Sequence, residues 1–407
     1  MAAPRITMAC MKKLADKIKS IRYFEITMLI YLAGFFFFPS SNLHKNYFYA
    51  AILTPYLLTF QFAEVKHFLH SPLYRWVVVF LIYITVSIFW NPVTQWQEYF
   101  KYAFRLMNSL VFITVICRLV VNDRLYIDKV WTYLVWVAGA MALISIIVFY
   151  ADHSFPLQRL QNWGPLYHPI VGGTCYGIAA IICYFHFLRN GPQTDWSLYG
   201  FILFVLLVDI WMTMSRGVWL GLIVGFFVGE FIRRNYWLTV LPVVLVVAYS
   251  CLVYLDIIEA SWFFVRDGGD SYRIAAWKWV LEKVSAAPWF GYGVNVDEAV
   301  PINDEITLVH AHSIYISNLL YGGVVAGVLL CIIVITCILE GLKQTQINGS
   351  ACYIAMTIFV FVCVATDNNT LLLNPVQIWF YTWFPIAILV GGQIRQLTVD
   401  QRSQIPL

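Results

Sequence analysis

The chain has 407 residues, of which 61% are hydrophobic, 17% are aromatic and 12% are charged, with a formal net charge of +4. A soluble domain carries about 25% charged residues, so this composition excludes a water-soluble enzyme, a nucleic-acid binder, a disordered scaffold and a disulfide-rich secreted domain. The mean hydropathy of +0.73 agrees. We therefore predict an all-α polytopic integral membrane protein.

Apolar runs follow one another along the whole chain. A membrane-spanning helix needs about 20 mostly apolar residues, and twelve runs approach or reach this length. We predict them as the transmembrane helices of a single domain, 1–407. They are 23–39, 46–63, 74–92, 103–121, 129–150, 169–188, 197–214, 217–232, 237–255, 313–336, 350–366 and 376–393.

The basic residues predict the orientation of these spans. If the N-terminal tail is cytoplasmic, 17 of the 26 Lys and Arg residues lie on that side. Such a bias normally marks the cytoplasmic side, and an even number of spans places both termini there. The positive net charge is thus mainly an orientation signal.

Two outer loops, 151–168 and 256–312, are long, and loops of more than about 15 residues are usually functional. The second is expected to form a loop subdomain with a helix that Asp270 caps. Apolar residues recur at helical spacing along this helix, at Ile274, Trp277, Leu281 and Val284. We expect an amphipathic helix lying on the membrane surface or over a cavity mouth.

Arginines on the outer side are the first candidates for function. Arg216 lies in a short turn between two spans, where the positive-inside bias opposes a basic residue. Its side chain either extends to the membrane interface as an anchor, or its guanidinium forms two parallel hydrogen bonds with an anionic headgroup or diphosphate. Asp209 is a candidate partner. Arg273, in the first turn of the loop helix, either pairs with Asp270 or faces an anion. Arg159 is a third candidate.

His310 and His312 stand where the long loop meets the tenth span. No further ligand is placed to complete a metal site with them. A neutral imidazole there can accept a proton as a general base, or it can simply be an interfacial histidine bonded to the backbone. Asp367, which follows the eleventh span, can orient an imidazole or pair with an arginine. The residues alone do not separate the two histidines.

Several short segments of the chain resemble motifs of the O-antigen ligase and polymerase superfamily. The resemblance rests on four segments and on their order along the chain: 215–221 with Arg216, Arg273 with Trp277, 288–293, and 310–313 followed by Gly322 and Gly327. The family motif usually has Asn after the second histidine, where this chain has Ser313. In topology the resemblance covers the whole chain.

The resemblance implies lipopolysaccharide biosynthesis at the bacterial inner membrane, with the active site on the periplasmic side. A glycan would move from undecaprenyl diphosphate to an acceptor, which in the ligase branch is a sugar hydroxyl of the lipid A core. By resemblance His312 is the general base, and Arg216 and Arg273 bind the donor diphosphate. Direct displacement would invert the anomeric carbon, without a cofactor or metal. The supporting residues would be His310, Asp367 and Arg159.

Three alternatives stay open. An O-antigen polymerase uses the same donor and often has, in a periplasmic loop, an arginine followed by ten residues and a glycine. In this chain the single arginine with that spacing is Arg189, before Gly200, and it is expected on the cytoplasmic side. A protein O-oligosaccharyltransferase often has a longer C-terminal periplasmic part. A secondary transporter or flippase predicts internal repeats and charges near the midplane, whereas the candidate charges here cluster at one face.

Overall fold

The computed structural model of the protein describes residues 21–91, 95–154, 158–190, 195–235, 272–302 and 306–403. The first helices are α2 (Ile21–Phe37), α3 (Ser41–Phe48), η1 (Tyr49–Leu53), α4 (Thr54–Leu58), α5 (Phe62–Phe68), α6 (Pro72–Val86), η2 (Ser87–Trp90), α7 (Trp96–Asn122) and α8 (Tyr126–Asp152). They are followed by η3 (Gly164–Leu166), α9 (Pro169–Asn190), α10 (Trp196–Met212), α11 (Arg216–Ile232), α13 (Arg273–Ser285), α14 (Ile314–Asn348), α15 (Cys352–Thr366), η6 (Trp379–Trp383) and α16 (Phe384–Ser403).

The described part of the chain is almost entirely helical, with one short antiparallel hairpin of β1 (Val300–Pro301) and β2 (Thr307–Leu308). Five of its helices are long and apolar enough to cross a membrane: Pro72–Trp90, Trp96–Asn122, Tyr126–Asp152, Pro169–His186 and Ile314–Asn348. Helices also occupy the other predicted spans except 237–255, which lies outside the described residues. The all-α class is confirmed, and the count of twelve spans stays a prediction.

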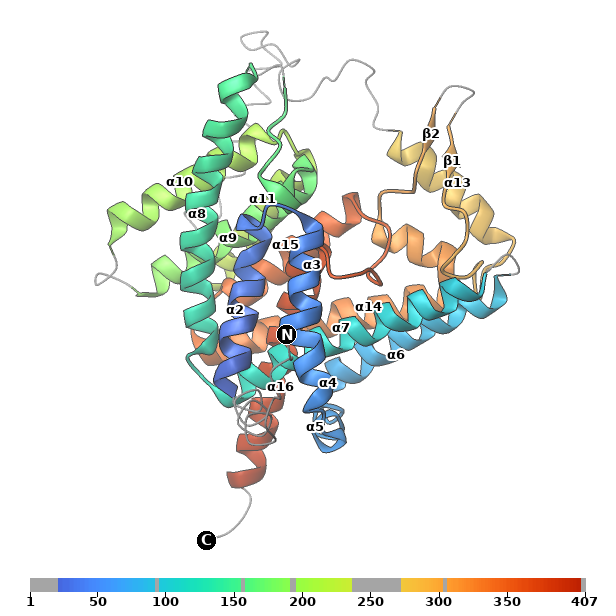
Figure 1. Cartoon of the computed structure of the whole chain (residues 1–407), viewed down its shortest axis with the longest axis horizontal. Helices are drawn as coiled ribbons and strands as arrows, with labels where there is room; N and C mark the ends of the chain where they lie inside the picture. The colour runs from blue at the N-terminus through green and yellow to red at the C-terminus, as the bar shows by residue number, and fades with distance from the viewer. Residues whose placement is uncertain are drawn as a thin grey trace, which may run out of the picture.

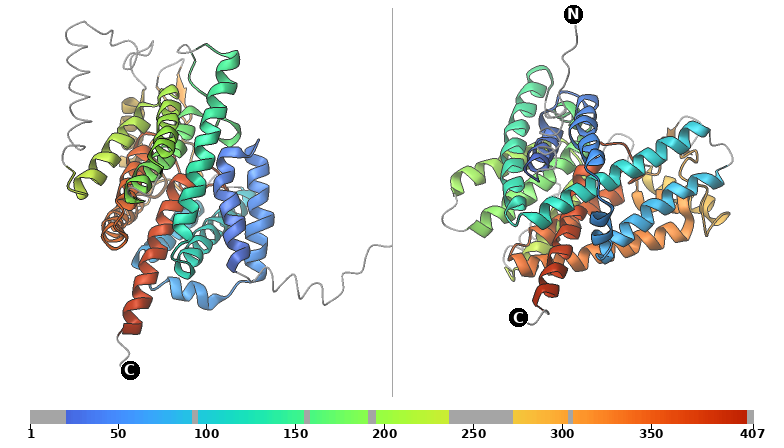
Figure 2. Two further views of the ribbon diagram at one scale, coloured as in Figure 1. Left: turned by 90° about the vertical axis from the view of Figure 1, so that its left-hand side faces the viewer. Right: turned by 60° about the horizontal axis from the view of Figure 1, so that its bottom comes forward.

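Close packing of α11 on α15 places the start of α11 beside the end of α15. Glycines on α11 allow the approach, because a Cβ at Gly221 would lie 2.7 Å from the Cys363 sulfur and one at Gly217 would lie 2.3 Å from Thr366 Oγ1. The first turn of α11 therefore lies beside the last turn of α15. Figures 1 and 2 show that α6, α7 and α14 lie side by side and extend towards α13 and the hairpin.

Helix α14 is broken near its start, at Gly323, whose φ of 62° and ψ of −157° are not helical. The segment 288–293 satisfies backbone groups that the break leaves without a helical partner. For example, the Gly293 N–H donates to the Tyr321 carbonyl at 2.8 Å. The glycine-rich segment that ends the long loop is thus built into the start of α14, and it fixes the loop against the helix bundle.

Helix α13 lies in the predicted place but differs in two details. Tyr272, with a left-handed φ of 54°, occupies the N-cap position, whereas the predicted cap, Asp270, lies outside the described residues. Of the predicted apolar positions, Ile274 and Leu281 are 58% and 46% exposed, whereas Val284 is buried. The buried face consists of Ala276, Val280 and Val284, which pack with residues of the hairpin and α14. Apolar residues occur on two faces of this helix, and its sequence does not indicate which one contacts the protein.

Candidate active site

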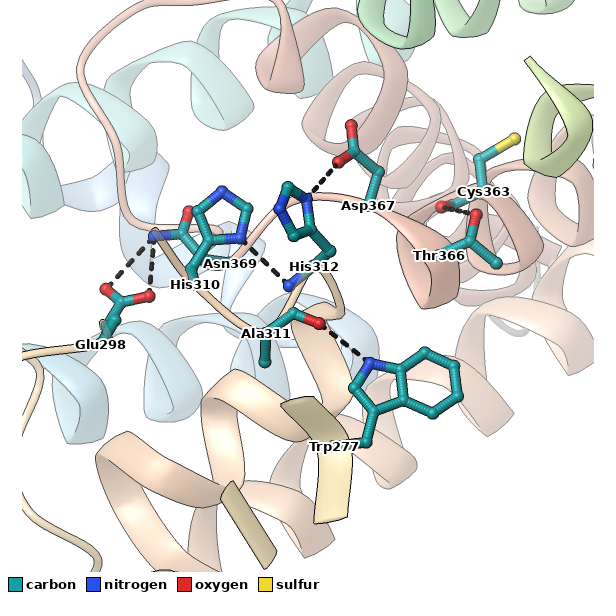
Figure 3. Close-up of polar contacts among 9 residues, drawn as sticks. All are labelled: Trp277, Glu298, His310, Ala311, His312, Cys363, Thr366, Asp367 and Asn369. Atoms are coloured by element: carbon teal, nitrogen blue, oxygen red, sulfur yellow. Dashed lines mark hydrogen bonds and ion pairs between the residues drawn. The ribbon is translucent and has the colours of Figure 1, made fainter. Parts of the chain in front are cut away.

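His312 and Asp367 form the centre of the candidate site (Figure 3). His312 precedes α14 and Asp367 follows α15, and these antiparallel neighbours bring the imidazole Nδ1 to 3.2 Å from the Asp367 Oδ1. The His312 side chain is 30% exposed and that of Asp367 is 9% exposed. His312 has a left-handed φ of 51°, a conformation that non-glycine residues adopt mainly where the surroundings impose it, often at functional sites.

This contact determines what the imidazole can do. Burial would raise the pKa of Asp367, but the hydrogen bond from His312 and the backbone N–H of Asn368 outweigh burial and lower this pKa. The carboxylate is therefore ionised and accepts from the His312 Nδ1–H. A histidine held in this tautomer presents the lone pair of Nε2 to its surroundings. Nε2 can then accept a proton.

His310 lies in a different environment, although the two rings are only 4.1 Å apart between centroids. Its Nδ1 accepts the backbone N–H of His312 at 3.1 Å, so the neutral ring carries its proton on Nε2. Burial, followed by the nearby His312 and Arg273, lowers the pKa of His310 to about 4, against an opposing effect of Asp367. His310 is thus a neutral hydrogen-bond donor near pH 7.

The loop that carries both histidines is tied to α13. The indole N–H of Trp277 donates to the carbonyl of Ala311, between the two histidines, at 2.9 Å (Figure 3). Arg273 lies one turn before Trp277 on the same helix and is half-buried. Its charge acts on His310, so the structure brings this arginine near the histidines.

Arg216 is the first residue of α11 and its side chain is exposed. Arg159 holds the turn before it, because its guanidinium donates to the Thr213 carbonyl at 2.8 Å and to the Ser215 hydroxyl at 3.0 Å. Arg159 therefore contacts the backbone that positions Arg216. The interpretation of Asp209 as a partner of Arg216 was wrong, since the hydrogen bond to this buried carboxylate comes from the Asn162 amide, at 3.3 Å.

The sequence analysis missed His168, which precedes α9 in the shorter outer loop. Partial desolvation of the imidazole lowers the pKa of His168. The charge of Asp367 raises this pKa, and the charges of Arg159 and His312 lower it. This third histidine is therefore close to the central pair. Its position could have been suspected only from the length of the loop, because no motif surrounds it.

A second carboxylate lies next to the central pair. The Asn369 amide, two residues after Asp367, donates to both carboxylate oxygens of Glu298, at 3.2 and 3.0 Å (Figure 3). Burial raises the pKa of Glu298, against the hydrogen bonds from the Asn369 amide. Glu298 and Asn369 are far apart in sequence and carry no local signal, so the sequence analysis missed this contact as well.

The set of side chains favours acid–base and anion chemistry. In the described ranges, no three His, Cys, Asp or Glu residues are grouped so as to hold a metal ion. Instead, a histidine–carboxylate pair is accompanied by two arginines that each begin a helix. Helix N-termini carry partial positive charge and favour anions. The arrangement can therefore accept a proton beside a bound anion.

Comparisons with known proteins agree with this chemistry. A sequence model described as O-antigen ligase matches residues 201–331. The chain is also 24% identical, over 383 residues and 90% of both chains, to a protein of Pseudomonas aeruginosa named O-antigen ligase. Residues 201–331 thus match the O-antigen ligase family, and the similarity along nearly the whole chain supports the same superfamily. Together with the apolar helices, these similarities support a membrane enzyme of the glycosyltransferase type that acts in lipopolysaccharide biosynthesis.

The family match contains Arg216, Arg273 and both histidines, and it ends before Asp367. A second relative, from Acinetobacter baylyi, is named general O-oligosaccharyltransferase. It is 23% identical over 157 residues, which make up 37% of this chain and 26% of the relative. Within the superfamily, the similarity to the ligase thus extends over far more of both proteins.

Proposed function

We propose that the protein transfers an O-antigen glycan from undecaprenyl diphosphate to a sugar hydroxyl of the lipid A core. The similarity over 90% of both chains to a protein named O-antigen ligase supports this choice of substrates. We further propose twelve spans in the bacterial inner membrane, with both termini cytoplasmic and residues 256–312 forming a periplasmic subdomain. The reaction then takes place at the periplasmic side.

His312 is the general base in the proposed mechanism. Its Nε2 accepts the proton of the acceptor hydroxyl while the hydroxyl oxygen forms a bond to the anomeric carbon of the glycan. The bond from this carbon to the diphosphate oxygen breaks, and its electron pair stays on the leaving undecaprenyl diphosphate. Attack opposite to the leaving group inverts the anomeric carbon. Asp367 stabilises the imidazolium and keeps it in the required tautomer.

The arginines stabilise the leaving group. Arg216 and Arg273 begin α11 and α13, so each guanidinium adds to the positive end of a helix. A planar fork can bind two oxygens of a phosphate at once. Stabilising charge that develops on the diphosphate in the transition state lowers the barrier. Arg159 acts indirectly, by holding the turn before Arg216, and His310 donates a hydrogen bond towards the substrate.

The hydrogen bond between the Nδ1 of His312 and an ionised Asp367, which leaves Nε2 as the nitrogen that can accept a proton, carries the proposal. A cell that lacks this chain and is complemented with either wild type or His312→Ala tests it. We expect wild type to restore the O-antigen ladder, and the variant to leave bare core and accumulated donor. A core capped with a single repeat would indicate a polymerase instead. Unchanged lipopolysaccharide with loss of glycan from proteins would indicate a protein O-oligosaccharyltransferase, the activity that the name of the Acinetobacter baylyi relative describes.

A further inference from the structure

A cavity of about 520 Å³ lies among the ends of five helices. It is lined by the end of α7, the start of α8, the end of α14, the start of α15 and the stretch 388–396 of α16. In Figure 1 the turn from α7 to α8 lies at the lower end of α8, beside α16. The volume is within the range of about 300–1,000 Å³ that is typical of ligand pockets.

The cavity is separate from the candidate active site. Helix α15 has Tyr353, which lines the cavity, in its first turn and leads to Asp367 at its other end. At 1.5 Å per residue, the 14 steps between these residues correspond to about 20 Å. Lys343, which also lines the cavity, follows His312 by 31 positions along α14. The two sites therefore lie at opposite ends of the same helices.

Basic side chains dominate the charge of the cavity. Arg124, Lys343 and Arg395 line it, against one acid, Asp128. Among the residues that the structure describes, neither Arg124 nor Lys343 forms an ion pair, whereas the nearby Lys129 is 2.8 Å from an Asp123 oxygen. An excess of cations over acids at one cavity, with two of the cations outside the ion pairs of the described structure, favours an anionic ligand.

Two further observations favour an anion whose oxygens can form hydrogen bonds. Burial and the charge of Arg124 lower the pKa of Arg395, and a bound anion would relieve this repulsion. The Gln396 side chain lines the cavity, and its amide N and O are buried without a hydrogen-bond partner in the described part of the chain. Such buried groups are unfavourable unless they bind a ligand or water.

The apolar part of the lining favours a lipid over a small ion. Leu125 and Ile347 line the cavity, and their side chains are 61% and 55% exposed. Ile127 and Ile388 line it further inside, where both are buried. A phosphate ester that carries acyl chains matches a cavity with basic groups and an apolar rim, and basic pockets between transmembrane helices bind anionic head groups in other proteins.

We propose that this basic cavity binds a phosphate group, supplied by the head group of an anionic phospholipid. The proposal is independent of the proposed transfer reaction, because it concerns the other end of the helices. Free phosphate shares the same chemistry and is the second source to be distinguished. The key residues are Arg124 and Lys343, and Arg395 serves mainly to bind the carbonyls of Val120 and Asp123.

The test is a titration of the detergent-solubilised full chain with three probes: short-chain phosphatidylglycerol, short-chain phosphatidylcholine and inorganic phosphate. The cavity variant is Arg124→Gln with Lys343→Gln. The matched control is Arg75→Gln with Lys66→Gln, which removes two exposed basic residues, predicted to lie on the same side, that do not line the cavity. We expect phosphatidylglycerol to bind wild type and the control equally, and the cavity variant about 30-fold more weakly, which is about 1 kcal/mol for each cation.

The three probes separate the sources of the phosphate group. Binding of phosphatidylglycerol without binding of phosphatidylcholine supports a lipid head group. Binding of inorganic phosphate that is weakened in the cavity variant, with no gain from the lipid, supports free phosphate. The proposal is overturned if the cavity variant binds like wild type, or if the control loses as much affinity as the cavity variant. If the double variant does not fold, Arg124→Gln alone carries the test, with about fivefold weaker binding expected.

Discussion

Replacing Asp367 by Asn tests the central contact of the site with the smallest change in shape. The amide of Asn cannot stabilise an imidazolium by charge. It can also donate to Nδ1, which would move the ring proton to Nε2 and leave no base facing the substrate. The substitution should therefore lower kcat and leave binding of the lipid-linked donor nearly unchanged.

The expected magnitude follows from the geometry. Unit charges 3.2 Å apart interact by about 5 kcal/mol at an effective dielectric constant of about 20. His312 is 30% exposed, and water at its ring reduces the interaction, so we expect about 3–4 kcal/mol. Since each 1.36 kcal/mol is a factor of ten in rate, kcat should fall by roughly 10²- to 10³-fold.

The assay measures initial rates of glycan transfer to lipid A core by the purified chain in nanodiscs, with donor binding measured separately. Asp209→Asn is the matched control, because Asp209 is also buried and accepts one hydrogen bond from an amide, yet contacts none of the proposed catalytic residues in the described structure. The control should retain activity. A variant Asp367→Asn with a kcat within about fivefold of wild type would refute the reasoning, as would a loss of activity that follows a loss of donor binding.

Five other results are expected in the same assay. His312→Ala should lose about 10²- to 10⁴-fold in kcat, the usual contribution of a general base. The activity of wild type should fall with decreasing pH, because a protonated His312 cannot accept a proton. His310 has a pKa of about 4, so His310→Ala should be milder and keep the pH dependence of wild type. Arg216→Lys and Arg273→Lys should each lose about 100-fold although the charge is kept, because one transition-state hydrogen bond is worth about 3 kcal/mol; normal rates would leave these arginines as anchoring residues. Activity should survive a chelator, and loss with rescue by divalent metal would contradict a metal-independent reaction. Glu298→Ala should impair transfer more than Glu298→Gln, which keeps an acceptor for the Asn369 amide; equal rates for both would mean that this contact does not position the loop after Asp367.

Much of this arrangement was accessible from the sequence because it is encoded locally. Long apolar runs predict helices, and the loop positions of Arg216, Arg273, His310 and His312 follow from the ends of these runs. The packing of α11 on α15 also has a local signal, in glycines spaced by four residues. In each case, the neighbours along the chain contain the information.

Contacts between distant segments were not accessible in this way. Glu298 meets Asn369 across 71 positions, and His168 approaches Asp367 across about 200 positions. The two histidines illustrate the same limit, since they stand two positions apart in one short segment. Only their partners distinguish them: Nδ1 of His310 is occupied by a backbone N–H, and Nδ1 of His312 by a carboxylate that leaves Nε2 available.

The long loop before α14 acts on the site in two ways through one helix. Arg273, at the start of α13, supplies a cation, and Trp277, one turn later, binds the carbonyl between the histidines. The buried face of α13 fixes this helix against α14, so the cation and the base are held relative to each other by a rigid element. A shift of α13 would therefore displace Arg273 and His312, the proposed diphosphate-binding residue and general base, together, and a misplacement of about 1 Å can cost about 10²-fold in rate. This explains why a segment outside the apolar spans determines the geometry of a site that lies between their ends.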